Sequence, residues 1–297
     1  MQRVWLYCWD VERCVGKRAE VEMKPMTRFY PMTRFYEALE SSFQPVFVSG
    51  SPRSGTTVCH ALICTSNEVN DYVPESSYLT GLLNNFIHGN SNEIHNLGLF
   101  GSMQEFQELN FEQISFVLHY LWLRLGHKKY LCLKDPIMFS HFDWLDQVFK
   151  QVKYVFTYRD PIETISSRVT VLKKEGKDIN ANVLAAISNE LLGYYHYAEK
   201  LVSTKSDRTL IVNYEDIIDG AAEKRLASFL SLDDINRNNL WKSEFFSKHQ
   251  RRDTAWSTPK YYQEISDKKT DITLTLDEIN FVNNMLRKTY DKLSSLI

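Results

Sequence analysis

The chain has 297 residues, of which 43% are hydrophobic and 24% are charged, and its formal net charge is -2. This composition is sufficient for one large core or two small ones and lacks the bias of disordered chains, and one α/β domain is its simplest interpretation. The nearly balanced charge argues against a surface-wide affinity for nucleic acid or anionic membranes, so neither is expected as a partner.

Residues 1–40 are predicted to form an N-terminal arm that precedes a single domain at residues 41–297. Within the arm, the hexapeptide PMTRFY occurs at residues 25–30 and again at 31–36. A single short repeat does not indicate a solenoid, which needs several longer units, so we interpret it as a local duplication that lengthens the arm. The apolar run near Trp5 is soon interrupted by charged residues, which argues against a signal peptide and favours a cytoplasmic protein.

The sequence PVFVSGSPRSGTTVCHAL at residues 45–62 predicts an anion-binding loop between a strand at 45–49 and a helix that starts at Gly55. Backbone N–H groups at a helix N-terminus favour an anion, and a glycine lets the ligand approach closely. A nucleoside-triphosphate loop would carry a lysine where this chain has Thr56. The side chains expected to contact the anion are those of Arg53, Ser54, Thr56 and Thr57.

Helical and strand patterns alternate through the rest of the chain. Helices are expected at about 76–88 and 111–125, from Pro161, after Asp216 and at the C-terminus, where Thr275 and Glu278 fit a capping box. Strands are expected at 129–133, 152–158 and 209–214. The alternation predicts a P-loop-like central parallel sheet flanked by helices. The most apolar helical run, which begins at Ile114, is shorter than the roughly 20 residues that cross a membrane.

Polar side chains stand where the predicted strands end. Arg53 and Lys134 follow the first two strands, and Arg159 and Tyr214 follow the next two. In open parallel sheets the ligand lies beyond the carboxyl ends of the strands. These four positions therefore predict one site for a polyanion.

The sequence TYRDPIETISSR at residues 157–168 predicts a second anion site at the start of a helix. Asp160 is expected as the N-cap, with Glu163 as its capping-box partner, so Arg159 lies just outside the helix. Ser167 is expected two turns into the helix, on the side that faces the strand end. An arginine and a serine hydroxyl can together hold a phosphate group.

The combination of GSPRSGTT after a strand with YRDP about a hundred residues later, and a serine eight positions after its arginine, resembles the sulfotransferases that use 3′-phosphoadenosine 5′-phosphosulfate (PAPS). The resemblance implies the sulfotransferase fold and a sulfuryl transfer that leaves 3′-phosphoadenosine 5′-phosphate (PAP). It implies that the first loop binds the 5′-phosphosulfate, and that Arg159 and Ser167 hold the 3′-phosphate.

Further matches extend this resemblance over most of the chain after Pro45. The run from Lys134 to Pro136 resembles the lysine-aspartate-proline of the tyrosylprotein sulfotransferases and their bacterial relatives. In those enzymes the lysine lies near the sulfuryl group. The sequence VNYED around Tyr214 resembles a strand end beside the nucleotide. The sequence RRDTAWSTPKYYQ loosely resembles the late loop that closes over the adenosine, and its expected contacts are Arg252, Trp256 and Ser257.

Sulfuryl transfer needs a general base and positive charge at the leaving phosphate. The resemblance to the tyrosylprotein branch implies Glu75 as the base, with Lys134 and Arg53 stabilising the leaving group. The alternative for Glu75 is a carboxylate that only complements a helix dipole. Competing bases are His60, His88 and His95.

The five cysteines lack the paired spacing of a zinc site, so reduced thiols and no metal are expected. Two rival functions remain, a P-loop kinase and a nucleotide-binding module without catalysis. The acceptor pocket is expected from residues 77–125, and a small molecule such as a bacterial or cyanobacterial natural product is the expected acceptor, by family analogy. The sequence leaves open the oligomeric state and the choice between O- and N-sulfation.

Overall fold

The computed structural model describes residues 42–205, 207–249 and 271–297. The predicted N-terminal arm with its repeated hexapeptide lies outside the described residues. The predicted adenosine contacts Arg252, Trp256 and Ser257 also lie outside them.

Four parallel strands form the central sheet in the order β2-β1-β3-β4. Their bounds are β1 Gln44–Gly50, β2 Tyr130–Lys134, β3 Lys153–Tyr158 and β4 Thr209–Asn213. Val48 pairs with Lys134, Gly50 with Thr157, and Tyr158 with Asn213, so all four carboxyl ends lie at one edge. The predicted parallel α/β sheet is confirmed.

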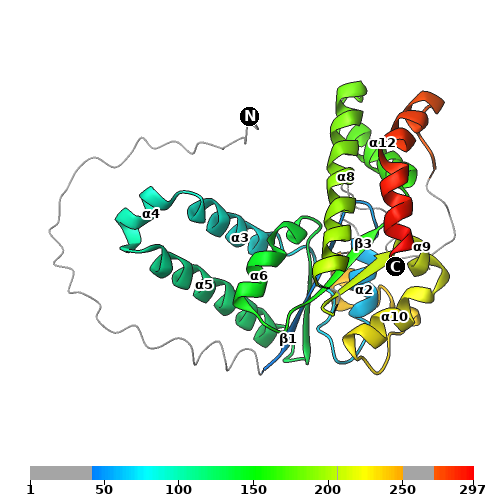
Figure 1. Cartoon of the computed structure of the whole chain (residues 1–297). Coiled ribbons are helices and arrows are strands. Elements are labelled where there is room, and N and C mark those ends of the chain that lie inside the picture. The colour runs from blue at the N-terminus through cyan, green and yellow to red at the C-terminus, as the bar shows by residue number, and fades with distance from the viewer. Residues whose placement is uncertain (1–41, 206, 250–270) are drawn as a thin grey trace.

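Alternate side chains of each strand enter two separate hydrophobic cores, because successive residues of a strand point to opposite faces. On β1, Phe47 enters one core, whereas Val46 and Val48 enter the other. Helices therefore cover both faces of the sheet (Figure 1). The first core receives α6 Phe142–Val148, α7 Pro161–Lys174, α8 Ala181–Thr204 and α12 Leu276–Ser295. The second receives α2 Thr56–Ile63, α9 Tyr214–Asp219 and α10 Ala221–Leu230.

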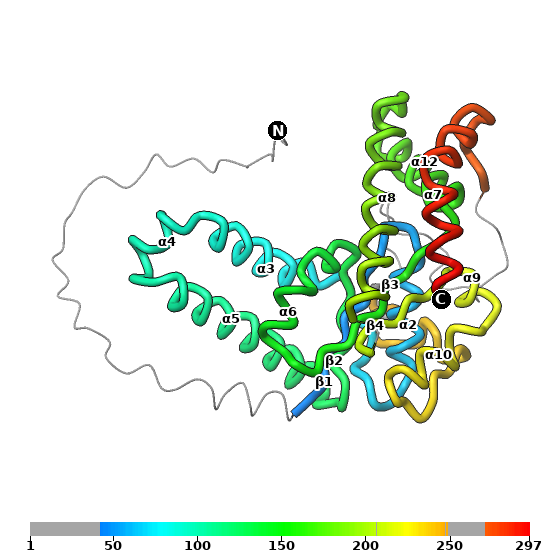
Figure 2. The backbone as a smooth tube through the Cα atoms, viewed as in Figure 1, coloured from blue at the N-terminus to red at the C-terminus, as the bar shows by residue number. Residues whose placement is uncertain are grey.

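The chain between β1 and β2 includes a long helical hairpin that projects away from the sheet (Figures 1 and 2). It consists of α3 Ser77–Asn90, α4 Glu93–Phe100 and α5 Met103–Arg124. Leu83 and Leu118 anchor its base in the first core, whereas Ile94 at the far end is 85% exposed. Within the described residues, no helix is long and apolar enough to cross a membrane.

The remaining helical elements are η1 Met138–His141, η2 Arg237–Asn239 and α11 Glu244–His249. Among the expected elements, the final helix has the predicted capping box between Thr275 and Glu278. The predicted start of α5 at residue 111 is wrong, since the helix begins at Met103, where the Ser102 hydroxyl accepts a hydrogen bond from the Glu105 N–H.

Candidate functional site

The loop between β1 and α2 requires glycine at its end. Gly55 has a φ of 94°, in the left-handed region that disfavours other residues. A Cβ atom added there would also lie 2.5 Å from the ring of Tyr214. No side chain among the described residues caps α2. Its first turn can therefore offer backbone N–H groups to an anion.

Ser54 holds this loop against β3. Its hydroxyl is fully buried, donates to the Ser51 carbonyl oxygen at 2.7 Å, and lies 2.8 Å from the Thr157 hydroxyl. The Ser54 N–H also donates to the Ser51 carbonyl, at 3.0 Å. The polar groups of Ser54, expected to contact the anion, are thus already engaged inside the protein.

The second anion element is built around Arg159. The buried hydroxyl of Tyr195 donates to the Arg159 carbonyl oxygen at 2.6 Å, and the guanidinium lies 4.1 Å from the centre of the Tyr214 ring. Asp160 is the predicted N-cap and accepts from the Ile162 and Glu163 N–H groups. The predicted capping-box role of Glu163 is wrong, because its carboxylate instead accepts from Arg159 Nε at 2.8 Å.

The two elements that are predicted to bind anions meet in space. Arg53 Nε donates to the Ser167 hydroxyl at 3.0 Å, which joins the first loop to the second turn of α7. The Tyr214 ring lies against both Gly55 and Arg159. Arg53, Gly55, Arg159, Ser167 and Tyr214 therefore form one continuous surface, although they come from three separate parts of the sequence.

Lys134 lies at the end of β2 and is only 2% exposed. Its ammonium group donates to the Thr57 hydroxyl at 3.1 Å and to Glu75 Oε1 at 2.7 Å. Burial lowers the pKa of Lys134, and the Glu75 carboxylate partly opposes this shift. The loop sequence has no lysine, but the Lys134 ammonium group from the neighbouring strand lies next to Thr57. Thr56 is buried.

Glu75 precedes α3 in the chain and lies beside the end of β2 in space. The N–H of Ser76, the next residue, donates to the Lys134 carbonyl oxygen at 2.9 Å, which fixes this segment to the strand end. The Glu75 side chain is 54% exposed, so it is accessible to a second substrate. A carboxylate, a buried cation and the anion loop are therefore adjacent.

The three candidate histidines lie elsewhere. His60 is fully buried, with Nε2 3.1 Å from the Cys132 carbonyl oxygen. His88 and His95 are exposed on α3 and α4 of the projecting hairpin. Of the four proposed bases, Glu75 is the one that forms an ion pair with Lys134.

Two residues that position the site, Thr157 and Tyr195, were not singled out from the sequence, and a third, Glu163, was expected only as a capping partner. Thr157 holds Ser54, Glu163 pairs with Arg159, and Tyr195 fixes the Arg159 backbone. Thr157 and Glu163 lie within the TYRDPIETISSR motif, so proximity to Arg159 was a usable signal. Tyr195 lies on α8, 36 residues from Arg159, and no local pattern connects the two.

The profile of the sulfotransferase family matches residues 45–234. The chain belongs to the sulfotransferase family. The matched range contains Arg53, Glu75, Lys134, Arg159 and Ser167, and it ends before the predicted adenosine loop. Among curated proteins, no sequence matches the chain.

The chain is similar to several solved sulfotransferase structures. The sulfotransferase domain from the curacin biosynthetic pathway has a TM-score of 0.50 and 17% identity, covering 83% of this chain and 97% of that chain. The sulfotransferase domain of the Synechococcus PCC 7002 olefin synthase has a TM-score of 0.46 and 18% identity, and the match covers 82% of this chain and 93% of that chain. Sulfotransferase STF1 from Mycobacterium tuberculosis H37Rv has a TM-score of 0.43 and 17% identity, and the match covers 86% of this chain and 80% of that chain.

Proposed function

We propose that this sulfotransferase uses PAPS as its donor and transfers the sulfuryl group to a hydroxyl or amine of a small molecule, leaving PAP. The main support is the contact between the two anion elements, in which Arg53 Nε donates to the Ser167 hydroxyl at 3.0 Å. A nucleotide with phosphate groups on both its 3′ and 5′ positions carries anions that such a joined surface can bind at once.

In the proposed complex, the N–H groups of the first turn of α2 bind the 5′-phosphosulfate, with Arg53 and Thr57 beside them. Arg159 and Ser167 bind the 3′-phosphate. Because Glu163 already pairs with Arg159, the incoming phosphate must share the guanidinium with this carboxylate or displace it. The Tyr214 ring, packed between Gly55 and Arg159, separates the two anions.

The proposed chemistry uses the contact between Lys134 and Glu75. A bond forms between the acceptor oxygen or nitrogen and sulfur, while the bond from sulfur to the 5′-phosphate oxygen breaks. Glu75 accepts the acceptor's proton. Lys134 and Arg53 stabilise the charge that develops on the leaving phosphate. Since Lys134 contacts both Thr57 and Glu75, the proposed base and the proposed leaving-group cation lie next to each other beside the anion loop.

The acceptor is proposed to enter from the α3–α5 side, because Glu75 directly precedes α3 and is half exposed. We retain a small hydroxyl- or amine-bearing natural product as its class. We also retain a cytoplasmic location, with which the free thiols of Cys59, Cys64 and Cys132 agree.

Two assays separate this proposal from its rivals. We expect transfer of labelled sulfate from PAPS to at least one member of an acceptor panel, and no transfer of the γ-phosphate of ATP. A P-loop kinase would give the reverse result. A nucleotide-binding module without catalysis would bind PAP in calorimetry and transfer neither group.

A further inference from the structure

A cluster of potential metal ligands lies in the second core. It comprises His60 on α2, Cys64 directly after that helix and Cys132 in the middle of β2. One ligand atom from each of the three side chains lies within 4.8 Å of the others. Zinc–sulfur and zinc–nitrogen bonds of about 2.3 and 2.0 Å bring ligand atoms to within roughly 4 Å of one another, so small side-chain rotations would close the cluster around an ion.

The hydrogen bonding of His60 is compatible with a metal ligand. Its Nε2 lies 3.1 Å from the Cys132 carbonyl oxygen, which can only accept a hydrogen bond, so Nε2 carries the proton. Nδ1 is therefore the nitrogen with the lone pair. It is buried and has no hydrogen-bond partner among the described residues. Metal-binding histidines commonly donate their other N–H to a backbone carbonyl in this way.

The backbone at Cys132 is held independently of any metal. Its N–H donates to Asn70 Oδ1 at 2.6 Å, and its carbonyl oxygen accepts from Asn70 Nδ2 at 3.1 Å. The Asn70 side chain thus fixes both polar groups of this residue. The thiol of Cys132 consequently extends from a rigid position, which favours a preformed site.

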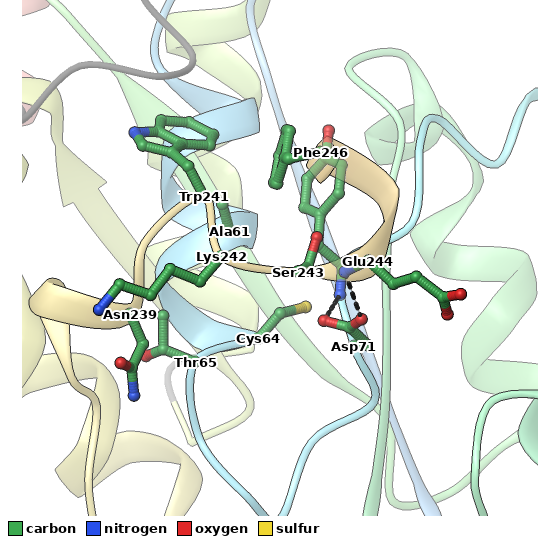
Figure 3. A pocket seen from close by; sticks show the side chains of 11 residues that line it. Ala61, Cys64, Thr65, Asp71, Asn239, Trp241, Lys242, Ser243, Glu244 and Phe246 are labelled. Carbon is green, nitrogen blue, oxygen red and sulfur yellow. Dashed lines mark hydrogen bonds between the residues drawn. The ribbon is translucent and has the colours of Figure 1, made fainter. Parts of the chain in front are cut away.

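A pocket of about 200 Å³ borders Cys64, which is one of the three residues of the cluster. Cys64 lines it and is partly exposed, and Figure 3 shows its sulfur pointing to the side on which Asp71 and Ser243 lie. Asp71 is held there by hydrogen bonds from the Tyr72 and Glu244 N–H groups. The pocket therefore offers an ion a path to the Cys64 sulfur.

We propose that His60, Cys64 and Cys132 bind one zinc ion. Two thiolates and a neutral imidazole are soft ligands that suit Zn²⁺ or Cu⁺. Two thiolates cancel the charge of a divalent ion but leave a net negative charge with Cu⁺, which is costly in an apolar core, so zinc is favoured. The ion would tie α2, which carries Thr57, to β2, which carries Lys134. The sequence-based expectation of no metal site arose because residues 60, 64 and 132 lack a recognisable spacing.

The test uses the full chain with Cys8 and Cys14 changed to serine, so that the remaining thiols are those of Cys59, Cys64 and Cys132. The reduced, chelator-treated protein is titrated with Co²⁺, and the thiolate-to-cobalt charge-transfer absorption measures binding. Zn²⁺ is then added as a competitor. We expect about one equivalent of Co²⁺ to bind and to be displaced by Zn²⁺. We also expect Zn²⁺ to raise the unfolding temperature, because an ion that binds only the folded state stabilises it.

Cys64→Ala is the decisive variant because Cys64 is only partly buried, and circular dichroism checks that it folds. It should lose the charge-transfer band and the zinc-dependent rise in unfolding temperature, whereas the control Cys59→Ala should keep both. The proposal is overturned if the reference protein gives no thiolate-to-cobalt band, or if folded Cys64→Ala binds as tightly as the reference. PAP binding, measured separately, reports on the proposed function.

Discussion

The two residues of the Glu75–Lys134 pair have different proposed roles, since Glu75 is the proposed base and Lys134 the proposed leaving-group cation. Glu75→Gln should lower turnover by about a hundredfold to ten-thousandfold, the usual contribution of a general base, while PAP binding is retained. Labelled-sulfate transfer and calorimetry with PAP measure the two effects. Glu68→Gln is a matched control, because Glu68 pairs with Lys129 at the opposite end of β2. Wild-type turnover in Glu75→Gln would transfer the role of base to another group.

The buried position of Lys134 predicts a particular pH dependence. Burial lowers its pKa below the ordinary 10.5, so its positive charge is lost at a lower pH than that of an exposed lysine. PAP affinity should therefore weaken as the pH rises through this lowered pKa. In Lys134→Arg, whose guanidinium stays charged, the alkaline weakening should move to higher pH.

Calorimetry with PAP between neutral pH and about pH 10.5 measures this shift. Lys153→Arg is the control. Lys153 lies at the amino end of β3, away from the carboxyl ends of the strands, and burial lowers its pKa as well. Identical alkaline profiles for wild type and a folded Lys134→Arg variant would show that Lys134 does not contact the bound nucleotide.

At the scale of secondary-structure elements, the capping box of α12 predicts a measurable stability. The Thr275 hydroxyl accepts from the Glu278 N–H, and the Glu278 carboxylate accepts from the Thr275 N–H at 2.7 Å. Thr275→Ala should lower the free energy of unfolding by about 1 kcal/mol. Denaturant unfolding measures the change, with Asp277→Ala as a control in the same turn. Unchanged stability in a folded Thr275→Ala variant would show that the cap does not stabilise the helix.

Elements with strong local signals were predictable from the sequence. An apolar strand followed by Gly55 predicted β1, the loop and α2, and Asp160 with Pro161 predicted the start of α7. The helix α4 was not predicted, because Asn92 makes no side-chain cap and Asn96 is its one buried residue. The helix α8 was also overlooked, although Leu184, Leu191 and Ala198 lie on its buried face.

Contacts between distant segments could be predicted only through the topology. The rule for parallel sheets placed Arg53, Lys134, Arg159 and Tyr214 at one edge, and the structure has all four there. It did not predict that Arg53 contacts Ser167 across 114 residues, or that Lys134 lies against Thr57. Nor did it bring His60, Cys64 and Cys132 together. Such contacts depend on side-chain packing, which has no fixed sequence spacing.

At the scale of the whole molecule, the sheet order explains why one nucleotide can contact four strand ends. β1 lies between β2 and β3, and β3 lies between β1 and β4. The loop after β1 therefore has Lys134 on one side and Arg159 on the other. We propose that these positions bind the two phosphate-bearing ends of the same molecule.

Calorimetry with PAP and with adenosine 5′-monophosphate, on wild type and on Arg159→Ala, tests this claim most directly. Loss of a charge-assisted contact of about 1.5–3 kcal/mol should weaken PAP binding by about tenfold or more. The same substitution should leave the affinity for adenosine 5′-monophosphate, which lacks the 3′-phosphate, nearly unchanged. An equal loss for both nucleotides, or no loss for PAP in a folded variant, would contradict the account.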